Sequence, residues 1–389
     1  MRARVGIVGA GPAGLLLSHL LHLHGIDSVV LELRSRDHVE NRIRAGVLEN
    51  TTEDLLTAAG LGARMCREGI AHEGINLRFD GRDHRIDFRA LTGRHVMVYS
   101  QHKVVQDLIA ARLAADGHVV FEADAVTVQD IATDHPRITW RHKGNLYALD
   151  CEFIAGCDGF HGICRASIPR GRVRMLERDY PFGWLGILAE AAPSSRELVY
   201  VNHPRGFALL SLRSPKISRL YLQCAPDENI EAWSDDHIWA ELHTRTARDG
   251  FTLNQGPIVQ KGITPMRSFV VEPMRYGRLF LLGDAAHIVP PTGAKGLNLA
   301  AADVAVLATA LAAFFDSGET DLLEGYSRTC LARVWKVQRF SWWMTSMLHR
   351  FEQHSEFEQR VQLAELEYVA GSVAASTALA ENYVGLKLG

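Results

Sequence analysis

The chain has 389 residues, of which 47% are hydrophobic and 22% charged, and its formal net charge is −3 at pH 7. A chain of this length and apolar content buries a large core and exceeds most single domains, so two or three substructures are expected. The near-neutral charge provides no overall field that would attract nucleic acid or an anionic membrane. Small molecules are therefore the expected partners.

Targeting and metal-binding patterns are absent from the sequence. Residues 1–4 run directly into a Gly-rich turn, without the apolar run of a signal peptide. The most apolar stretch, 304–315, is shorter than the roughly 20 residues of a membrane span, so we interpret it as a buried helix. The six cysteines form no CxxC pair and the 18 histidines no HExxH motif, so disulfides and a metal site are not expected. A cytoplasmic location fits this composition.

The N-terminal segment predicts a βαβ unit. Residues 4–8 and 28–33 have strand patterns, and residues 12–24 between them have the apolar spacing of a helix. Pro12 suits the first helical position, where its missing N–H is not needed. The histidines of this helix, including His19, are expected to face solvent or its end.

A Gly-rich turn with the sequence GAGPAG joins the first strand to the helix. Gly9 allows the tight turn, Gly11 lets the backbone approach a pyrophosphate, and Gly14 lets helix and strand pack closely. The helix N-terminus attracts the negative charge of the phosphates. Glu32, at the end of the second strand, is placed to accept hydrogen bonds from a ribose. The motif predicts a dinucleotide but does not distinguish FAD from NAD.

The middle of the chain has a different pattern. From about 180 to 260, short strand-like runs are separated by turns, which predicts a mostly antiparallel sheet inserted into an α/β domain. A further strand at 279–282 leads to a turn and then to a long tract rich in Ala and Leu, with helical patterns that persist to about 371.

Two more short motifs occur in the order that a flavin site needs. Asp158 precedes a glycine in AGCDGF, and Asp284 follows one in LGDAAH. Each carboxylate follows a predicted strand, where it can bind ribityl or ribose hydroxyls. With the first motif, this combination resembles the group A flavoprotein monooxygenases. The resemblance implies bound FAD, with Asp284 on the ribityl chain and the helix that begins near Leu297 directed at the flavin ring.

This resemblance implies an α/β fold with three parts. We expect a discontinuous, Rossmann-like FAD-binding domain at 1–174 and 268–297. An inserted, mostly antiparallel β-sheet domain at 175–267 is expected to bind the substrate. The remaining residues, 298–389, are expected to form a helical C-terminal region through which two copies assemble as a homodimer.

Longer segments extend the resemblance from Val5 to Leu386 and narrow it to the 4-hydroxybenzoate hydroxylases of that family. These segments are 42–48, 180–186, 202–208, 290–298, 340–345 and 381–385. The resemblance implies hydroxylation of 4-hydroxybenzoate to 3,4-dihydroxybenzoate with NAD(P)H and O2, through a C4a-hydroperoxyflavin. The alternatives are a hydroxylase of 3,4-dihydroxybenzoate or 4-aminobenzoate, a non-catalytic flavin-binding protein, and an NAD-dependent dehydrogenase.

The expected substrate pocket has a charged end and a phenolic end. A benzoate carboxylate is bound best by a planar guanidinium flanked by hydroxyls, a role that the resemblance gives to Arg213, Ser211 and Tyr221. Ser211 and Arg213 are two positions apart, which puts them on one face of a strand.

At the phenolic end, the resemblance implies a proton relay from Tyr200 through Tyr383 to His72, whose ordinary pKa near ~6.5 suits proton exchange. The backbone carbonyl of Pro291 would orient the substrate hydroxyl.

The resemblance also assigns the residues that contact the two nucleotides. The expected FAD contacts are Gly9, Gly11, Gly14, Glu32, Arg42, Arg44, Val47, Gln101, Asp158, Asp284, Lys295, Gly296, Leu297 and Asn298. The expected NAD(P)H contacts are Arg34, His38, Arg42, Arg44, His161, Arg165 and Arg267. Strongly NADPH-selective relatives carry Arg and Tyr where this chain has Leu33 and His38. We therefore expect NADPH to be used and NADH to be tolerated.

Overall fold

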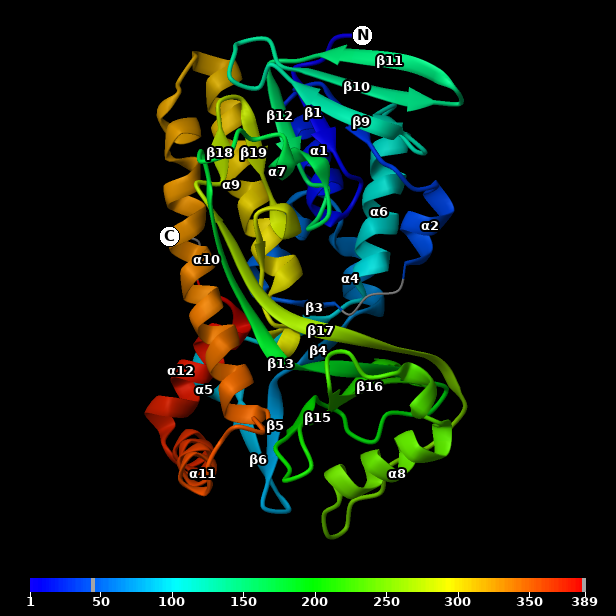
Figure 1. Ribbon diagram of the computed structural model, residues 1–389, viewed down its shortest axis with the longest axis vertical. Helices are drawn as coiled ribbons and strands as arrows, with labels where there is room; N and C mark the ends of the chain where they lie inside the picture. Colours follow the sequence, from blue (N-terminus) through cyan, green and yellow to red (C-terminus); the bar gives the residue numbers. More distant parts are fainter. Residues whose placement is uncertain (43–45, 387–389) are drawn as a thin grey trace.

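The computed structural model describes residues 1–42 and 46–386. Two large sheets form the two ends of the molecule, and the long helix α10 (Asp321–Leu348) runs beside both of them (Figure 1). The sheets contain strands from distant parts of the chain. The α/β fold class predicted from the sequence, with a helical C-terminal region, is confirmed.

The first sheet has the strand order β18-β19-β12-β1-β2-β8. Its strands are β1 (Val5–Val8), β2 (Ser28–Leu31), β8 (His118–Val120), β12 (Phe153–Gly156), β18 (Arg275–Tyr276) and β19 (Leu279–Leu281). All neighbours pair in parallel except β18 and β19. The helix α1 (Pro12–Leu23) connects β1 to β2, so the βαβ unit lies where the sequence predicted it.

The second sheet has the order β20-β17-β13-β16-β15-β14-β5-β6 and is antiparallel except where β14 meets β5. Its strands are β5 (Gly74–Phe79), β6 (Arg82–Asp87), β13 (Arg174–Ala189), β14 (Val199–Val201), β15 (Ala208–Ser214), β16 (Ile217–Cys224), β17 (Ile258–Glu272) and β20 (His287–Ile288). The sheet therefore extends beyond the predicted range 175–267, because β14 pairs with β5 from the N-terminal part of the chain.

The remaining strands form two small sheets. The outer one has the order β11-β10-β9, and the inner one, between the two large sheets, has the order β3-β7-β4. Their strands are β9 (Asp124–Gln129), β10 (Arg137–His142), β11 (Asn145–Asp150), β3 (Val47–Leu48), β7 (Val96–Val98) and β4 (Ile70–His72).

Helices pack on both large sheets and form the C-terminal region. Besides α1 and α10 they are α2 (Arg36–Asn41), α3 (Asn50–Ala58), α4 (Gly62–Glu68), α5 (Phe88–Thr92), α6 (Gln101–Ala114), α7 (Ile163–Ala166), α8 (Asp235–Thr246), α9 (Gly296–Ser317), α11 (Glu356–Gly371) and α12 (Val373–Val384). In Figure 1, α11 and α12 lie beside β5 and β6, at the same end as the second sheet.

The helix α9 is longer than the apolar stretch from which it was predicted. It spans 22 residues and is long and apolar enough to cross a membrane by length and composition, and 61% of its apolar window is buried within the protein. Leu299, Val304, Leu307 and Leu311 join the core that α9 shares with α1 and the parallel sheet. The length argument from the sequence was therefore wrong, whereas its interpretation as a buried helix is confirmed.

Candidate active site

The three glycines of the turn between β1 and α1 have different surroundings. Gly9 has a φ of 103°, and a Cβ there would lie 2.4 Å from the carbonyl oxygen of Cys157. A Cβ on Gly14 would lie 2.0 Å from the carbonyl oxygen of Gly9. A Cβ on Gly11, the residue that caps α1, would meet no protein atom within 4 Å. Gly9 and Gly14 thus allow close packing, while Gly11 borders open space at a helix N-terminus, which suits a phosphate.

Three carboxylates surround the expected path of a dinucleotide. Glu32 is held by the backbone N–H groups of Ala10 and Arg34, at 2.8 Å each. The Asp158 Oδ2 accepts from the Cys164 N–H at 2.8 Å, whereas its buried Oδ1 has no hydrogen-bond partner among the described residues. Burial raises the pKa of Asp158. Asp284 is exposed although both of its neighbours are buried. These acceptors fit the ribose and ribityl hydroxyls of FAD.

Asp303, which sequence reasoning missed, holds the turn that carries Asp284. Its Oδ2 accepts from the Gly283 N–H at 3.0 Å and from His287 Nε2 at 2.6 Å. Burial alone would lower the pKa of His287, but the Asp303 carboxylate outweighs burial and raises it. The imidazole and the carboxylate therefore form a buried pair between the turn and α9. No local pattern marks Asp303, because it lies 20 positions from Gly283 inside an apolar helix.

Lys295 and Asn298, predicted to contact FAD, use their side-chain groups within the protein. The Lys295 ammonium donates to Glu49 Oε1 at 2.7 Å and to the Tyr383 carbonyl at 2.8 Å. The Asn298 amide accepts from the Glu49 N–H at 2.9 Å and donates to the Val47 carbonyl at 2.8 Å. These side chains hold β3 and α12 against the start of α9. Gly296, Leu297 and Gln101 keep exposed or partly exposed positions, so they remain available to a ligand.

Four polar side chains of the expected pocket lie on one face of the second sheet. Tyr200 pairs with Leu209 across strands, and Leu209 pairs with Tyr221, so these three side chains point to the same side. Ser211 follows Leu209 by two positions and shares that face. The Arg213 guanidinium donates to Ser211 Oγ at 3.1 Å, and burial lowers its pKa. Among the described residues, the hydrogen-bond partners of the Arg213 guanidinium are Ser211 Oγ and the Leu212 carbonyl, neither of which is a carboxylate.

The tyrosine pair lies at the other end of this face. Tyr200 and Tyr383 are each 1% exposed, and their hydroxyl oxygens are 2.6 Å apart. Burial raises the pKa of both phenols, so both stay neutral. The Pro291 carbonyl accepts from the Ala294 N–H at 2.9 Å, and its second lone pair remains for another donor. Pro291 itself is exposed.

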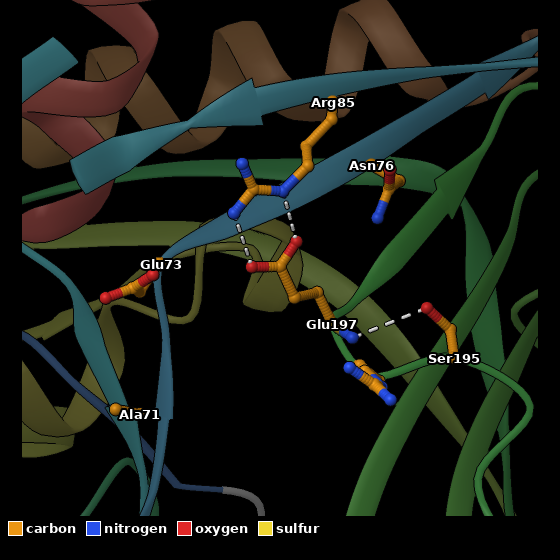
Figure 2. Close-up of a pocket in the computed structure, with 7 residues that line it drawn as sticks. Ala71, Glu73, Asn76, Arg85, Ser195 and Glu197 are labelled. Carbon is orange, nitrogen blue, oxygen red and sulfur yellow. Dashed lines mark hydrogen bonds and ion pairs between the residues drawn. The ribbon is translucent and has the colours of Figure 1, made fainter. Parts of the chain in front are cut away.

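His72 is more buried, and its pKa is lower, than expected for a residue that exchanges protons with solvent. Its side chain is 1% exposed, and neither ring nitrogen has a hydrogen-bond partner among the described residues. Burial lowers its pKa to about 4, and the charge of Glu197 opposes this shift. A polar cleft of about 460 Å³ lies beside it, lined by its neighbours Ala71 and Glu73 and by the Arg85–Glu197 ion pair (Figure 2). His72 is therefore near solvent but closed off from it.

The residues expected to contact NAD(P)H fall into two groups. Arg165 and Arg267 lie over the ring of Phe160, each within 4.9 Å of its centroid, and His161 packs against the same ring. Arg34 and His38 are exposed at the start of α2. Arg42 precedes the residues outside the described ranges, and Arg44 is one of those residues, so the expectation for Arg44 has no structural counterpart.

Comparison with known proteins identifies the family. Residues 2–341 match the model of the FAD binding domain family. The chain is also 50% identical, over 99% of its length and 96% of the relative's, to the p-hydroxybenzoate hydroxylase of Acinetobacter baylyi. The chain belongs to the FAD-dependent aromatic hydroxylases. As a member of this family it is an FAD-dependent monooxygenase.

Other hydroxylases of the family are more distant. The chain is 27% identical to 3-(3-hydroxy-phenyl)propionate/3-hydroxycinnamic acid hydroxylase 2 of Burkholderia vietnamiensis, over 80% of its own length and 57% of that longer protein. The structure of p-nitrophenol 4-monooxygenase PnpA from Pseudomonas putida covers 99% of both chains with a TM-score of 0.83 at 19% identity. This last likeness shows the shared hydroxylase fold.

Proposed function

We propose that this monooxygenase hydroxylates 4-hydroxybenzoate to 3,4-dihydroxybenzoate with NAD(P)H and O2. The observation that carries the proposal is one sheet face with Arg213, Ser211 and Tyr221 at one end and the tyrosine pair at the other. The similarity to p-hydroxybenzoate hydroxylase supports the same substrate. A guanidinium without a carboxylate partner and a buried phenol pair are complementary to the acid and the hydroxyl of this substrate.

The residues of the charged end bind and orient the substrate. The Arg213 guanidinium pairs with the substrate carboxylate, and the hydroxyls of Ser211 and Tyr221 complete its hydrogen bonds. Because the guanidinium is already held by Ser211 Oγ and the Leu212 carbonyl, little of its freedom remains to be lost on binding.

The residues of the phenolic end remove a proton from the substrate. Held by the β1–α1 turn, Glu32, Asp158 and Asp284, FAD would supply the redox chemistry, which is acceptance of a hydride from the nicotinamide and activation of O2. Tyr200 hydrogen-bonds the substrate oxygen and passes its proton to the Tyr383 hydroxyl, 2.6 Å away. The Pro291 carbonyl orients the substrate hydroxyl through its remaining lone pair. His72 carries the proton on to the cleft of Figure 2, which requires an opening that wets its ring.

We propose NADPH as the hydride donor, with NADH accepted. The arginines around Phe160 and the exposed Arg34 offer positive charge to the pyrophosphate, which both nucleotides carry. Leu33 has no charge with which to select the 2′-phosphate of NADPH, so NADH should be accepted as well. Initial rates with each nucleotide test this, and complete inactivity with NADH would contradict its second half.

We also propose a homodimer formed through α11. Phe357, Val361 and Tyr368 are 76%, 53% and 61% exposed and follow the spacing of one helix face. A second copy is the occupant that covers such a stripe on each subunit. Sedimentation should give the mass of a dimer, and Phe357→Glu should shift it to the monomer; a monomeric parent protein would refute the proposal.

A cytoplasmic location is proposed as well. All six cysteines are free, and five of them are buried, which suits a reducing compartment. Cell fractionation tests this, and recovery of the protein in the periplasm or membranes would refute it.

The deciding experiment measures coupled turnover. Purified protein is mixed with FAD, NADPH, air and 4-hydroxybenzoate, and 3,4-dihydroxybenzoate is compared with the nicotinamide oxidised. We expect a ratio near one. Arg213→Lys should raise the KM for the acid by roughly tenfold, because it keeps the charge but loses the bidentate geometry. Lys216→Gln, on the exposed turn that follows Arg213, is the control.

Other substrates separate the alternatives. Faster coupled turnover of 3,4-dihydroxybenzoate or 4-aminobenzoate would reassign the substrate. Oxidation of nicotinamide without any hydroxylated product would leave 4-hydroxybenzoate as an effector only. A flavin-containing protein that oxidises no nicotinamide with any of the three acids would be a binder rather than an enzyme.

A further inference from the structure

His349 lies behind the expected substrate pocket, at the C-terminal end of α10. It is fully buried, and its imidazole is stacked between two aromatic rings. The centroid of Phe207 is 4.3 Å away and that of Phe182 is 4.7 Å away, with interplanar angles of 23° and 4°. The two stacked rings set the plane of the imidazole, and its two nitrogens are directed at Trp184 and at the Thr345 carbonyl.

The hydrogen bonds of His349 define its protonation state. Trp184 Nε1 donates to His349 Nε2 at 2.7 Å, and the indole N–H can only donate. His349 Nδ1 lies 3.0 Å from the Thr345 carbonyl, which can only accept, so Nδ1 carries the single proton. Burial lowers the pKa of His349 to about 3, in agreement with a neutral ring.

Through Trp184, His349 supports the charged end of the pocket. The Trp184 ring packs on Tyr221 at 4.8 Å and is stacked on Phe207 at 5.2 Å. Trp184 lies on β13, one strand away from Tyr221 on β16. The indole is therefore the surface against which Tyr221 rests, and its hydrogen bond to His349 fixes its rotation.

Through Thr345, the same turn of α10 supports the phenolic end. The Thr345 hydroxyl donates to the Ser341 carbonyl at 2.7 Å. Its oxygen lies 2.9 Å from Thr292 Oγ1, which must then be the donor between the two hydroxyls. Thr292 follows Pro291 in the short 3-10 turn Pro291–Gly293. One helical turn thus contacts the supports of both ends of the pocket.

We propose that His349 is a positioning residue for the substrate. It acts through Trp184, which supports Tyr221, and through the Thr345–Thr292 contact, which supports Pro291. By fixing the distance between Tyr221 and Pro291, it sets the position of the aromatic ring relative to the flavin. The inference rests on the proposed function, since it assumes that these two residues hold opposite ends of one benzoate. His349 itself contacts neither the substrate nor the cofactor.

The test compares variants by two readouts: the Kd for 4-hydroxybenzoate, measured by flavin fluorescence, and the 3,4-dihydroxybenzoate formed per NADPH oxidised. His349→Leu leaves the Trp184 N–H without an acceptor and should raise Kd roughly tenfold and at least halve the product ratio. His349→Gln keeps an acceptor near the Nε2 position and should restore most of both. Trp184→Phe combined with His349→Leu removes the unpaired donor, so its loss should be smaller than the sum of the single losses.

His19→Leu is the matched control, because His19 is a buried histidine on α1 with a 2.9 Å contact to the Ala59 carbonyl, remote from these strands. It should lower the thermal midpoint and leave Kd and the product ratio unchanged. If His349→Leu behaves like this control, or if His349→Gln is as impaired as His349→Leu, the inference is wrong. Should His349→Leu fail to fold, Trp184→Phe alone must change both readouts, and unchanged values would overturn it. A wild-type protein that binds 4-hydroxybenzoate but forms no product would instead refute the proposed function.

Discussion

The hydroxyl oxygens of Tyr200 and Tyr383 lie 2.6 Å apart although 183 positions separate the two residues in the chain. Tyr200 comes from β14 in the second sheet and Tyr383 from α12 near the C-terminus. Burial raises the pKa of both phenols, so the pair passes a proton along without either member carrying a charge at rest. This short contact connects the substrate face to the helical C-terminal region.

Removal of the Tyr200 hydroxyl should therefore slow the reaction more than it weakens binding. We expect Tyr200→Phe to lower kcat roughly 100-fold or more, the usual size of an acid–base contribution, with a KM within about threefold of wild type. Absorbance titration of bound 4-hydroxybenzoate should show less phenolate at neutral pH. Tyr147→Phe, at an exposed position on β11, should change neither quantity. An unaltered phenolate fraction in Tyr200→Phe would remove Tyr200 from the relay.

Gly11 and Gly14 should fail in different ways when they are replaced by alanine. A Cβ on Gly11 meets no protein atom within 4 Å, and its φ of −72° suits any residue. Gly11→Ala should thus leave the thermal midpoint of the apoprotein unchanged and raise the Kd for FAD at least tenfold, because the methyl group occupies the approach of the pyrophosphate. Gly14→Ala places a Cβ 2.0 Å from the Gly9 carbonyl and should lower the apoprotein midpoint itself. Equal FAD binding by Gly11→Ala and wild type would exclude a pyrophosphate at this turn.

The features that could be predicted from the sequence are those encoded locally. The strand, glycine turn and helix around Gly9 lie within about 30 residues, so each part is recognisable beside the next. Ser211 and Arg213 are two positions apart on one strand, and their contact needed only the strand period. The resemblance to a family supplied the distant partners, such as Tyr383, which no local pattern indicates.

Features that depend on distant pairing were missed or misjudged. The parallel pairing of β14 with β5 carries the second sheet outside the range expected for it. The sequence did not indicate that the ammonium of Lys295, itself an expected FAD contact, is held by Glu49, which is 246 positions away; the expected contact with FAD stays a prediction. His19 was expected to face solvent, yet it is 7% exposed and contacts Ala59. In each case, the surroundings of the residue or strand depend on a contact with a segment that is distant in the sequence.

Asp303 should prove important for FAD binding although it lies behind the site. Asp303→Asn removes the carboxylate that raises the pKa of His287 and breaks the buried pair, so the thermal midpoint should fall clearly below that of wild type. Since Asp303 also holds the Gly283 N–H, the Kd for FAD should rise by about tenfold or more. Thermal unfolding measures the change in stability, and flavin fluorescence measures the Kd for FAD. Asp316→Asn, at the exposed end of α9, is the control, and a loss of stability without weaker FAD binding would separate Asp303 from the cofactor turn.

Two of the buried histidines, His72 and His349, should make the protein sensitive to mild acid. Burial lowers the pKa of His72 to about 4 and of His349 to about 3, whereas both titrate near ~6.5 in the unfolded chain. Below that value the unfolded state takes up protons that the folded state does not, so stability is complete above pH ~6.5 and falls as the pH drops. At pH ~5 each histidine should cost about 2 kcal/mol of unfolding free energy.

A variant without one imidazole isolates this effect. Between pH ~7 and pH ~5, the free energy of unfolding of His72→Gln should fall by about 2 kcal/mol less than that of wild type, because glutamine binds no proton in either state. Urea unfolding at the two pH values, with saturating FAD, measures the difference. His22→Gln, at an exposed position on α1, should retain the full pH dependence of wild type. An identical pH dependence in His72→Gln and wild type would mean that the His72 ring is wetted and protonated in the folded protein, in which case it exchanges protons with the cleft directly.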